Sequence, residues 1–331
     1  MTEQTSQAPE RIDHYRIERV LYEGNGCVVY RAFDERENRA AAIKITASGE
    51  LPSSPSHRVW REGQLEHPSI LKCHGSGTHE GRPYIAIEYA DGGMFDTFLA
   101  QVRRSIPENV RAKERLKDEY IVSMIQRFYD LALALVSIHR GGSSHGNIKP
   151  SNIAICTNRN QFKLSDIGAS TRSSRDTELE LHQIAYRAPE TLRNKAENAG
   201  EAAADVYALG VVLYEALTLE YPHDAEDAKQ YITRVISSRA VPAASRNPNL
   251  PANVESVVMK AVAQDPSDRY QSASEFADDL LRIMNKETVT APSVSPGDRI
   301  LVGLKRHWLA TLFVLVLVAI VGLIIFRDFL Y

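Results

Sequence analysis

The chain contains few cysteines and little net charge for its 331 residues. Its three cysteines, Cys27, Cys73 and Cys156, lie far apart and form no CxxC pair, which argues against a disulfide framework and against a cysteine-based zinc site. Free cysteines of this kind are usual in a reducing compartment, so we expect most of the chain to be cytosolic. The net charge of −3 leaves no overall basic footprint, and we therefore expect no nucleic-acid partner.

Charged side chains are absent from residues 308–326 (WLATLFVLVLVAIVGLIIF), where Thr311 is the only polar residue. A helix of about 19 residues rises roughly 30 Å, the thickness of a bilayer core. A buried or interfacial helix is the alternative, but such helices seldom run this long without a charge. Basic residues at 305–307 precede the run. We therefore expect a single-pass transmembrane helix, with residues 1–306 in the cytoplasm and 327–331 outside.

The hydrophobic period changes between residues 89 and 120. Residues 15–89 contain short β-branched runs separated by turn residues, which predicts a strand-rich unit. From Tyr120 onward apolar residues recur at helical spacing. This predicts a long core-facing helix to Ile138 and further helices at 205–219, 227–237, 254–264 and 274–284. The Thr/Ser/Pro-rich stretch that follows is typical of a linker.

Several short motifs follow one another between residues 41 and 270. They are AAIK (41–44), EYA (88–90), HGNIKPSN (145–152), DIG (166–168), APE (188–190), DVYALG (205–210) and DPSDRY (265–270). Each one alone has an ordinary structural explanation; APE, for example, can begin a helix with proline at its first position. Their shared order over most of the chain is hard to explain by chance.

In this order the motifs resemble those of the Hanks-type protein kinases, of the kind common among bacterial serine/threonine kinases. The resemblance covers roughly residues 15–284. It implies an α+β, bilobal protein-kinase-like fold with a small β-rich N-lobe and a larger α-helical C-lobe, followed here by one C-terminal transmembrane helix. Small-molecule kinases of the aminoglycoside or choline type also begin this loop with His-Gly, but the APE, DVYALG and DPSDRY motifs are protein-kinase features.

These expectations divide the chain into five parts. They are a tail at 1–14, a kinase-like domain at 15–286 with lobes at 15–89 and 90–286, a juxtamembrane linker at 287–307, the membrane helix at 308–326 and a short tail at 327–331.

The resemblance implies a site for ATP and Mg²⁺. Lys44 matches the strand lysine that contacts the α- and β-phosphates. Glu62 lies where helix C would supply the ion-pair partner of that lysine. The segment between Glu62 and His67-Pro68 is short by roughly one helical turn, however, which weakens the expectation of this pair.

The resemblance also assigns the remaining nucleotide contacts. Gly24 matches the second glycine of the glycine-rich loop, and the backbone of Glu88 and Ala90 matches the hinge that meets the adenine ring. Asn152 and Asp166 match the Mg²⁺ ligands. Alternatively, a kinase-derived fold could keep such residues for the packing of its lobes alone.

Other positions concern phosphoryl transfer and the C-lobe. Lys149 matches the residue whose charge lies beside the γ-phosphate, and Glu190 and Arg269 match a buried pair that holds the C-lobe together in the family. Asn147 stands where the family has the catalytic aspartate, which accepts and orients the substrate hydroxyl. An amide can orient that hydroxyl but carries no charge and cannot act as the base. Loss of a general base costs about 10²- to 10⁴-fold in rate.

Four further positions depart from the family pattern. Tyr22 and Cys27 stand at the first and third glycines of the glycine-rich loop, so side chains occur where backbone should approach phosphate closely. Gly146 replaces the arginine that pairs with an activation-loop phosphate. Gln183 replaces a threonine that contacts the catalytic aspartate in the family.

These departures favour a pseudokinase, a membrane-anchored protein-kinase-like domain that acts as a signalling scaffold or allosteric partner of another protein and could still bind ATP. The alternative is a low-activity serine/threonine kinase that transfers the ATP γ-phosphate to protein substrates. Losing the base lowers the rate without removing positioning and electrostatic stabilisation, so both interpretations stay open.

Overall fold

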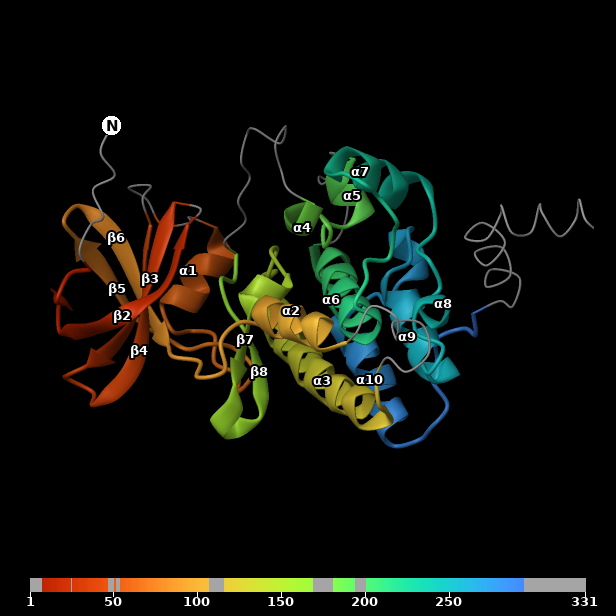
Figure 1. The fold of residues 1–331 in the computed structure, drawn as a ribbon, viewed down its shortest axis with the longest axis horizontal. Helices are drawn as coiled ribbons and strands as arrows, with labels where there is room; N and C mark the ends of the chain where they lie inside the picture. Colours follow the sequence, from red (N-terminus) through yellow and green to blue (C-terminus); the bar gives the residue numbers. More distant parts are fainter. Residues whose placement is uncertain are drawn as a thin grey trace, which may run out of the picture.

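The computed structural model describes residues 8–24, 26–46, 51, 54–106, 116–168, 181–193 and 201–294. In these residues a sheet-rich lobe lies beside a larger helical lobe (Figure 1). The bilobal α+β fold expected from the sequence is therefore confirmed. The expected membrane helix at 308–326 lies outside the described residues.

The N-lobe is an antiparallel six-stranded sheet. Its strands are, in spatial order, β1 (Arg11–Ile12), β2 (Tyr15–Gly24), β3 (Cys27–Asp34), β4 (Arg39–Thr46), β6 (Arg82–Glu88) and β5 (Cys73–His79). Helix α1 (Pro55–Arg61) packs beside β5. Lys44 in β4 is paired with Val29 on one side and Ile85 on the other, so ladders on both edges of the strand fix its position.

The C-lobe is built around α3 (Asp118–Arg140). The inward-facing residues expected from the helical period are all buried, namely Ile121, Met124, Ile125, Phe128, Leu131, Ala132, Leu135 and Ile138. The other helices are α2 (Phe95–Ser105), α4 (Leu181–Ile184), α5 (Pro189–Leu192), α6 (Glu201–Thr218), α7 (Ala228–Ser237), α8 (Ala243–Arg246), α9 (Ala252–Ala261) and α10 (Ala273–Met284). The four later helices predicted from the sequence are α6, α7, α9 and α10, with shifted ends.

Within the described residues, α3 is the one helix that is long and apolar enough to cross a bilayer. Half of its most apolar window is buried inside the protein, and the helix packs against α6 and α10. The core helix of a soluble lobe has the same length and composition, so this is weak evidence for a membrane span at α3.

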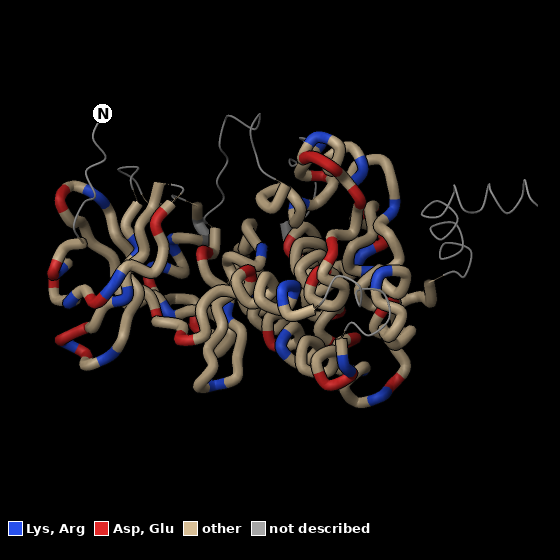
Figure 2. Tube along the Cα trace, viewed as in Figure 1, with Lys and Arg blue, Asp and Glu red and all other residues tan. Residues whose placement is uncertain are grey.

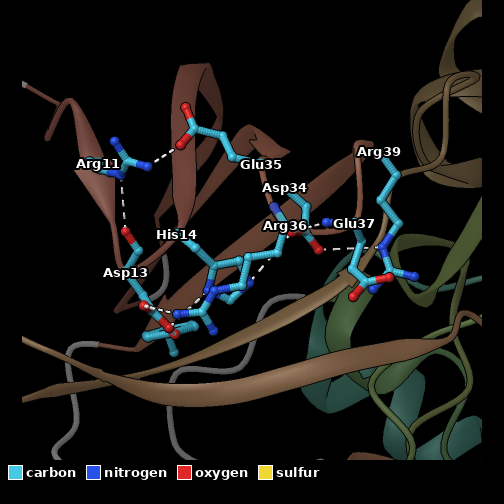
Figure 3. A network of polar contacts seen from close by, with 9 residues as sticks. Arg11, Asp13, His14, Asp34, Glu35, Arg36, Glu37 and Arg39 are labelled. Atoms are coloured by element: carbon cyan, nitrogen blue, oxygen red, sulfur yellow. Dashed lines mark hydrogen bonds and ion pairs between the residues drawn. The ribbon is translucent and has the colours of Figure 1, made fainter.

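Charges of both signs are interspersed along the two lobes (Figure 2). One local network lies at the end of the sheet where β3 turns into β4 (Figure 3). The buried carboxylate of Asp34 accepts hydrogen bonds from the backbone N–H groups of Arg36 and Glu37, both at 3.1 Å. Burial raises the pKa of Asp34, but these donors and the charges of His14 and Arg39 lower it by more, so it falls below its usual range. The ionised carboxylate therefore ties the turn at 34–39 to the turn that carries His14.

The pair of Glu190 and Arg269 expected in the C-lobe is confirmed. Nη1 and Nη2 of Arg269 donate to the two carboxylate oxygens of Glu190 at 2.7 and 2.8 Å, and both side chains are buried. Nε of Arg269 also donates to the carbonyl of Ala263 at 2.7 Å, and the guanidinium lies 4.7 Å from the ring of Tyr207. This bidentate pair joins the start of α5 to the loop after α9.

Removing one partner of this pair should unfold the C-lobe more easily. Glu190→Gln leaves the buried guanidinium of Arg269 without its counter-charge, and breaking such a pair costs about 3–5 kcal/mol of unfolding free energy. Urea unfolding followed by circular dichroism measures the change.

The matched control is Glu66→Gln, which breaks the exposed pair of Lys72 and Glu66 (2.9 Å) and should change the midpoint little. Equal midpoints for the two variants would contradict the structural role of Glu190.

Candidate functional site

Asp205, near the start of α6, holds the backbone of the loop at 145–152. Its buried carboxylate accepts hydrogen bonds from the N–H groups of His145 and Gly146, at 2.8 and 2.9 Å. His139 Nε2, at the end of α3, lies 2.9 Å from the same carboxylate. The aspartate of the DVYALG motif therefore fixes the conformation of the HGNIKPSN loop, although the two segments lie far apart in sequence.

A short hairpin brings the two expected metal ligands together. Its strands are β7 (Ile153–Cys156) and β8 (Gln161–Leu164), paired so that Ile153 lies opposite Leu164. Asn152 directly precedes β7, and Asp166 follows β8 after one residue. The N–H of Ser165 donates to the carbonyl of Asn152 at 3.0 Å, which extends the ladder toward the site.

Asn147 and Lys149 lie in the same loop and are both half-buried. The side-chain amide of Asn152 donates to the carbonyl of Asn147 at 2.8 Å, which holds the loop closed. Burial lowers the pKa of Lys149 and outweighs the attraction of Asp166. The neighbouring cations Lys44 and Arg187 lower it further. An anion bound beside Lys149 would relieve this repulsion between cations.

Lys44 and Asp166 form an ion pair between the lobes, with Nζ 2.6 Å from Oδ2. Burial lowers the pKa of Lys44, but Asp166 raises it by more, and the net shift is upward. Burial raises the pKa of Asp166, but Lys44 lowers it by more, and the net shift is downward. Asp166 also has a left-handed backbone (φ 55°), a conformation that costs roughly 1–3 kcal/mol in a non-glycine residue. The surrounding structure holds this side chain in place against that cost.

Glu62 is not brought to Lys44, which corrects the expectation from the sequence. Helix α1 has seven residues and ends at Arg61, and Glu62 is its exposed C-cap. The carboxylate of Glu62 accepts a hydrogen bond from Gln64 at 3.2 Å. The helix ends before the short segment that leads to His67-Pro68, so Glu62 lies beyond its last residue. His57 and Trp60 are buried side chains of this helix, and Trp60 Nε1 donates to the carbonyl of Leu71 at 2.8 Å.

The hinge residues lie at the end of β6. The N–H of Glu88 donates to the carbonyl of Lys72 at 2.8 Å, and both carboxylate oxygens of Glu88 accept from the buried Lys163, also at 2.8 Å. Ala90 follows and is half-buried. The side chain of Glu88 thus ties the hinge to β8.

The glycine-rich loop is a hairpin between β2 and β3 in which Gly24 pairs with Cys27. A Cβ atom at Gly24 would lie 2.9 Å from the hydroxyl of Tyr22, so the Tyr22 ring lies across the glycine. Burial raises the pKa of the Cys27 thiol, and the charges of Lys44 and Asp166 act on it in opposite directions. Both side chains that replace glycines therefore lie close to the place where phosphates would bind.

Two residues of the site were not identified from the sequence. Ser54 caps α1 and donates from its hydroxyl to the carbonyl of Gly168 at 2.7 Å. His57 is buried in the first turn of the same helix and contributes to the electrostatic lowering of the pKa of Asp166. A serine followed by proline is a known helix-start signal and could have located Ser54, but no sequence pattern indicates that His57 turns inward.

Asp166 and Asn152 fit a magnesium ion that arrives with a nucleotide. Their carboxylate and amide oxygens are ligands that Mg²⁺ accepts, with water and phosphate oxygens completing the shell. Within the described ranges no group of three His, Cys, Asp or Glu side chains could hold a metal alone. These two residues would therefore hold the ion only together with the phosphates, and the ion would neutralise phosphate charge.

The lysine on a central strand, the loop fixed by α6 and the DIG segment between two lobes define a protein-kinase-like protein. The family model described as the protein kinase domain matches residues 15–291. The chain belongs to the protein kinase family, in its Hanks-type branch of bacterial serine/threonine kinases.

Curated relatives match over most of this chain but only part of their own length. Serine/threonine-protein kinase PknB of Mycobacterium tuberculosis is 31% identical over 298 residues, which are 85% of this chain and 45% of that protein. A probable serine/threonine-protein kinase of Clostridium perfringens is 26% identical over 295 residues, covering 86% and 40% respectively. The chain thus spans less than half the length of these relatives.

Solved structures share the fold. The kinase domain of Mycobacterium tuberculosis PknI has a TM-score of 0.58 at 24% identity, covering 84% of this chain and 97% of that domain. Rad53 1–466, in complex with AMP-PNP, has a TM-score of 0.62 at 20% identity, covering 80% and 64%. At these identities the likeness concerns the fold alone.

ATP should bind more tightly with Mg²⁺ than without it. Two substitutions should separate the contribution of the phosphate contact from that of Mg²⁺. Lys44→Ala should weaken binding about tenfold or more, because it removes a charge-assisted contact to phosphate. Asp166→Asn should remove the dependence on Mg²⁺. Isothermal titration with ATP, with and without Mg²⁺, measures both effects.

Lys72→Ala, an exposed lysine on the same lobe, is the control and should bind like the unmodified protein. Binding that is unchanged in both Lys44→Ala and Asp166→Asn would place the nucleotide elsewhere.

Proposed function

We propose that the protein is a membrane-anchored pseudokinase, a kinase-like domain that binds ATP·Mg²⁺ and acts as a scaffold or allosteric partner of another protein. The observation that carries this proposal is Asn147. The loop around it keeps the hydrogen bonds that position a catalytic residue, but the residue itself has no charge and cannot accept a proton. The loop therefore keeps the position of the catalytic residue, but the carboxylate that would act as the base is lost.

The nucleotide loop supports the same proposal. Tyr22 lies across Gly24, and Cys27 pairs with Gly24 on the opposite strand of the same hairpin. A triphosphate that binds here must displace or share space with these side chains. Transfer depends on alignment of the γ-phosphate within a fraction of an ångström, so binding tolerates this crowding better than transfer does.

A low-activity serine/threonine kinase is the second candidate, and two observations favour it. The curated relatives are named serine/threonine-protein kinases. Lys44, Lys149 and Asp166 also remain in one site, and phosphoryl transfer depends mostly on such positioning and electrostatic stabilisation. In that case the amide of Asn147 would orient the substrate hydroxyl, and a protein Ser/Thr side chain would be the acceptor.

The membrane anchor is a proposal from sequence. The uncharged run at 308–326 has the length of a bilayer-spanning helix, and basic residues precede it. It would hold the kinase-like domain at the cytoplasmic face of a membrane and so concentrate it beside other membrane proteins.

Restoring the base alone, with Asn147→Asp, should raise phosphotransfer by much less than the 10²- to 10⁴-fold typical of a general base. The four other departures, Tyr22, Cys27, Gly146 and Gln183, stay in place in that variant. A combined variant restores the family residue at four of the five positions through Tyr22→Gly, Cys27→Gly, Asn147→Asp and Gln183→Thr. Its gain should exceed the product of the separate effects, because residues of one catalytic unit are not additive. Transfer of label from γ-labelled ATP to a general protein substrate measures all variants.

Adding Lys44→Ala to each active variant is the control for contaminating kinases. The pseudokinase proposal fails if the unmodified protein phosphorylates a substrate robustly and Lys44→Ala abolishes it. It also fails if Asn147→Asp alone reaches ordinary kinase turnover.

Removing all residues after Ser295 should release the domain from membranes without unfolding it. The described fold ends before this point, and the apolar run lies beyond it. Fractionation of cell membranes, followed by circular dichroism of the soluble product, tests both parts. Recovery of the full-length chain in the soluble fraction without detergent would contradict the anchor.

A further inference from the structure

Helix α1 lacks the ion pair that was expected to fix it, and two other contacts hold it. Trp60, at its C-terminal end, donates to the carbonyl of Leu71 and is almost fully buried. This contact ties the helix to its own lobe. The contact at the other end of α1 crosses to the C-lobe, and it involves Ser54.

The hydroxyl of Ser54 makes two hydrogen bonds in opposite directions. Its oxygen accepts from the N–H of His57 at 3.1 Å, which caps the helix. Its single proton is donated to the carbonyl of Gly168 at 2.7 Å. The cap of α1 is therefore also a bond to the last residue of the DIG segment.

Gly168 extends the connection to the catalytic loop. Its N–H donates to the carbonyl of His145 at 2.8 Å, and its backbone is left-handed (φ 68°), which suits glycine. The backbone of a single residue, Gly168, therefore joins α1, the metal-binding segment and the loop that carries Asn147. Asp166 lies two residues before it.

His57 reinforces the contact from the first turn of α1. Its side chain is 1% exposed, and its ring meets Trp60 edge-on at 5.6 Å between centroids. His57 is thus packed on the buried side of α1, against Trp60.

We propose that Ser54 is a positioning residue that couples α1 to the Asp166–Gly168 segment through its hydrogen bond to Gly168. This inference rests on the nucleotide site of the proposed function. ATP·Mg²⁺ bound at Asp166 would then also hold the N-terminal end of α1 in place through this bond.

Three substitutions at Ser54 separate its role in capping α1 from its hydrogen bond to Gly168. Ser54→Asp keeps an oxygen that caps the helix but has no proton for the carbonyl of Gly168. Ser54→Thr keeps both functions, and Ser54→Ala removes both. Glu62→Gln is the matched control. In a kinase whose helix C glutamate pairs with the strand lysine, this change would disturb the nucleotide site, but here Glu62 is exposed and bonds to Gln64.

Hydrogen exchange of the full-length protein in detergent measures the coupling without any ligand. Ser54→Asp should raise exchange at the amides of residues 165–168 roughly fivefold, the effect of one lost hydrogen bond, and leave α1 protected. Ser54→Ala should raise exchange in both segments, while Ser54→Thr and Glu62→Gln should change neither. Unchanged exchange at 165–168 in Ser54→Asp would overturn the proposal, as would an equal effect from Glu62→Gln.

Titration with ATP·Mg²⁺ then tests the link to the nucleotide. Ser54→Asp should reduce the gain in affinity that Mg²⁺ provides, Ser54→Thr should restore it, and Glu62→Gln should leave it unchanged. A Mg²⁺ effect that is equal in Ser54→Asp and the unmodified protein would overturn the link. If the unmodified protein binds no ATP·Mg²⁺, the nucleotide part of the proposed function fails, and the exchange experiment still decides whether Ser54 couples the segments.

Discussion

The ion pair between Lys44 and Asp166 is the interaction on which the site depends. It joins the central strand of the N-lobe to the segment after β8, across the boundary between the lobes. Each charge stabilises the other against the cost of burial, as the opposite shifts of their pKa values indicate. A bound phosphate alone would pair with Lys44 and leave Asp166 without its partner. A bound cation alone would pair with Asp166 and leave Lys44 without its partner. The pair therefore favours ligands that carry both charges, as ATP with its metal does.

Binding and transfer make different demands, and this chain meets them unequally. Binding needs opposite charges and a hinge backbone, which Lys44, Asp166 and the end of β6 supply. Transfer also needs a base and a phosphate aligned with the acceptor. Asn147 cannot supply the first, and we propose that the side chains of Tyr22 and Cys27 disturb the second. This difference is the reason for proposing a protein that responds to nucleotide rather than one that consumes it.

Much of the fold followed from the sequence because its signals are local or periodic. The 3.6-residue period located α3 and its buried face, and motif order located the Glu190–Arg269 pair. The structure pairs Lys44 with Asp166 and not with Glu62, because motif spacing does not show that the helix ends at Arg61, one residue before Glu62. The bond between Ser54 and Gly168 joins residues far apart in sequence, and only the tertiary structure shows it.

We propose that the site holds ATP·Mg²⁺ without transferring its phosphate. The fate of the bound nucleotide tests this most directly. The purified protein is incubated overnight with a stoichiometric amount of ATP·Mg²⁺, the nucleotide is extracted and identified, and the intact mass of the protein is measured. We predict that ATP is recovered unchanged and that the protein gains no phosphoryl group. Recovery of ADP, together with a protein heavier by one or more phosphoryl groups, would contradict the account.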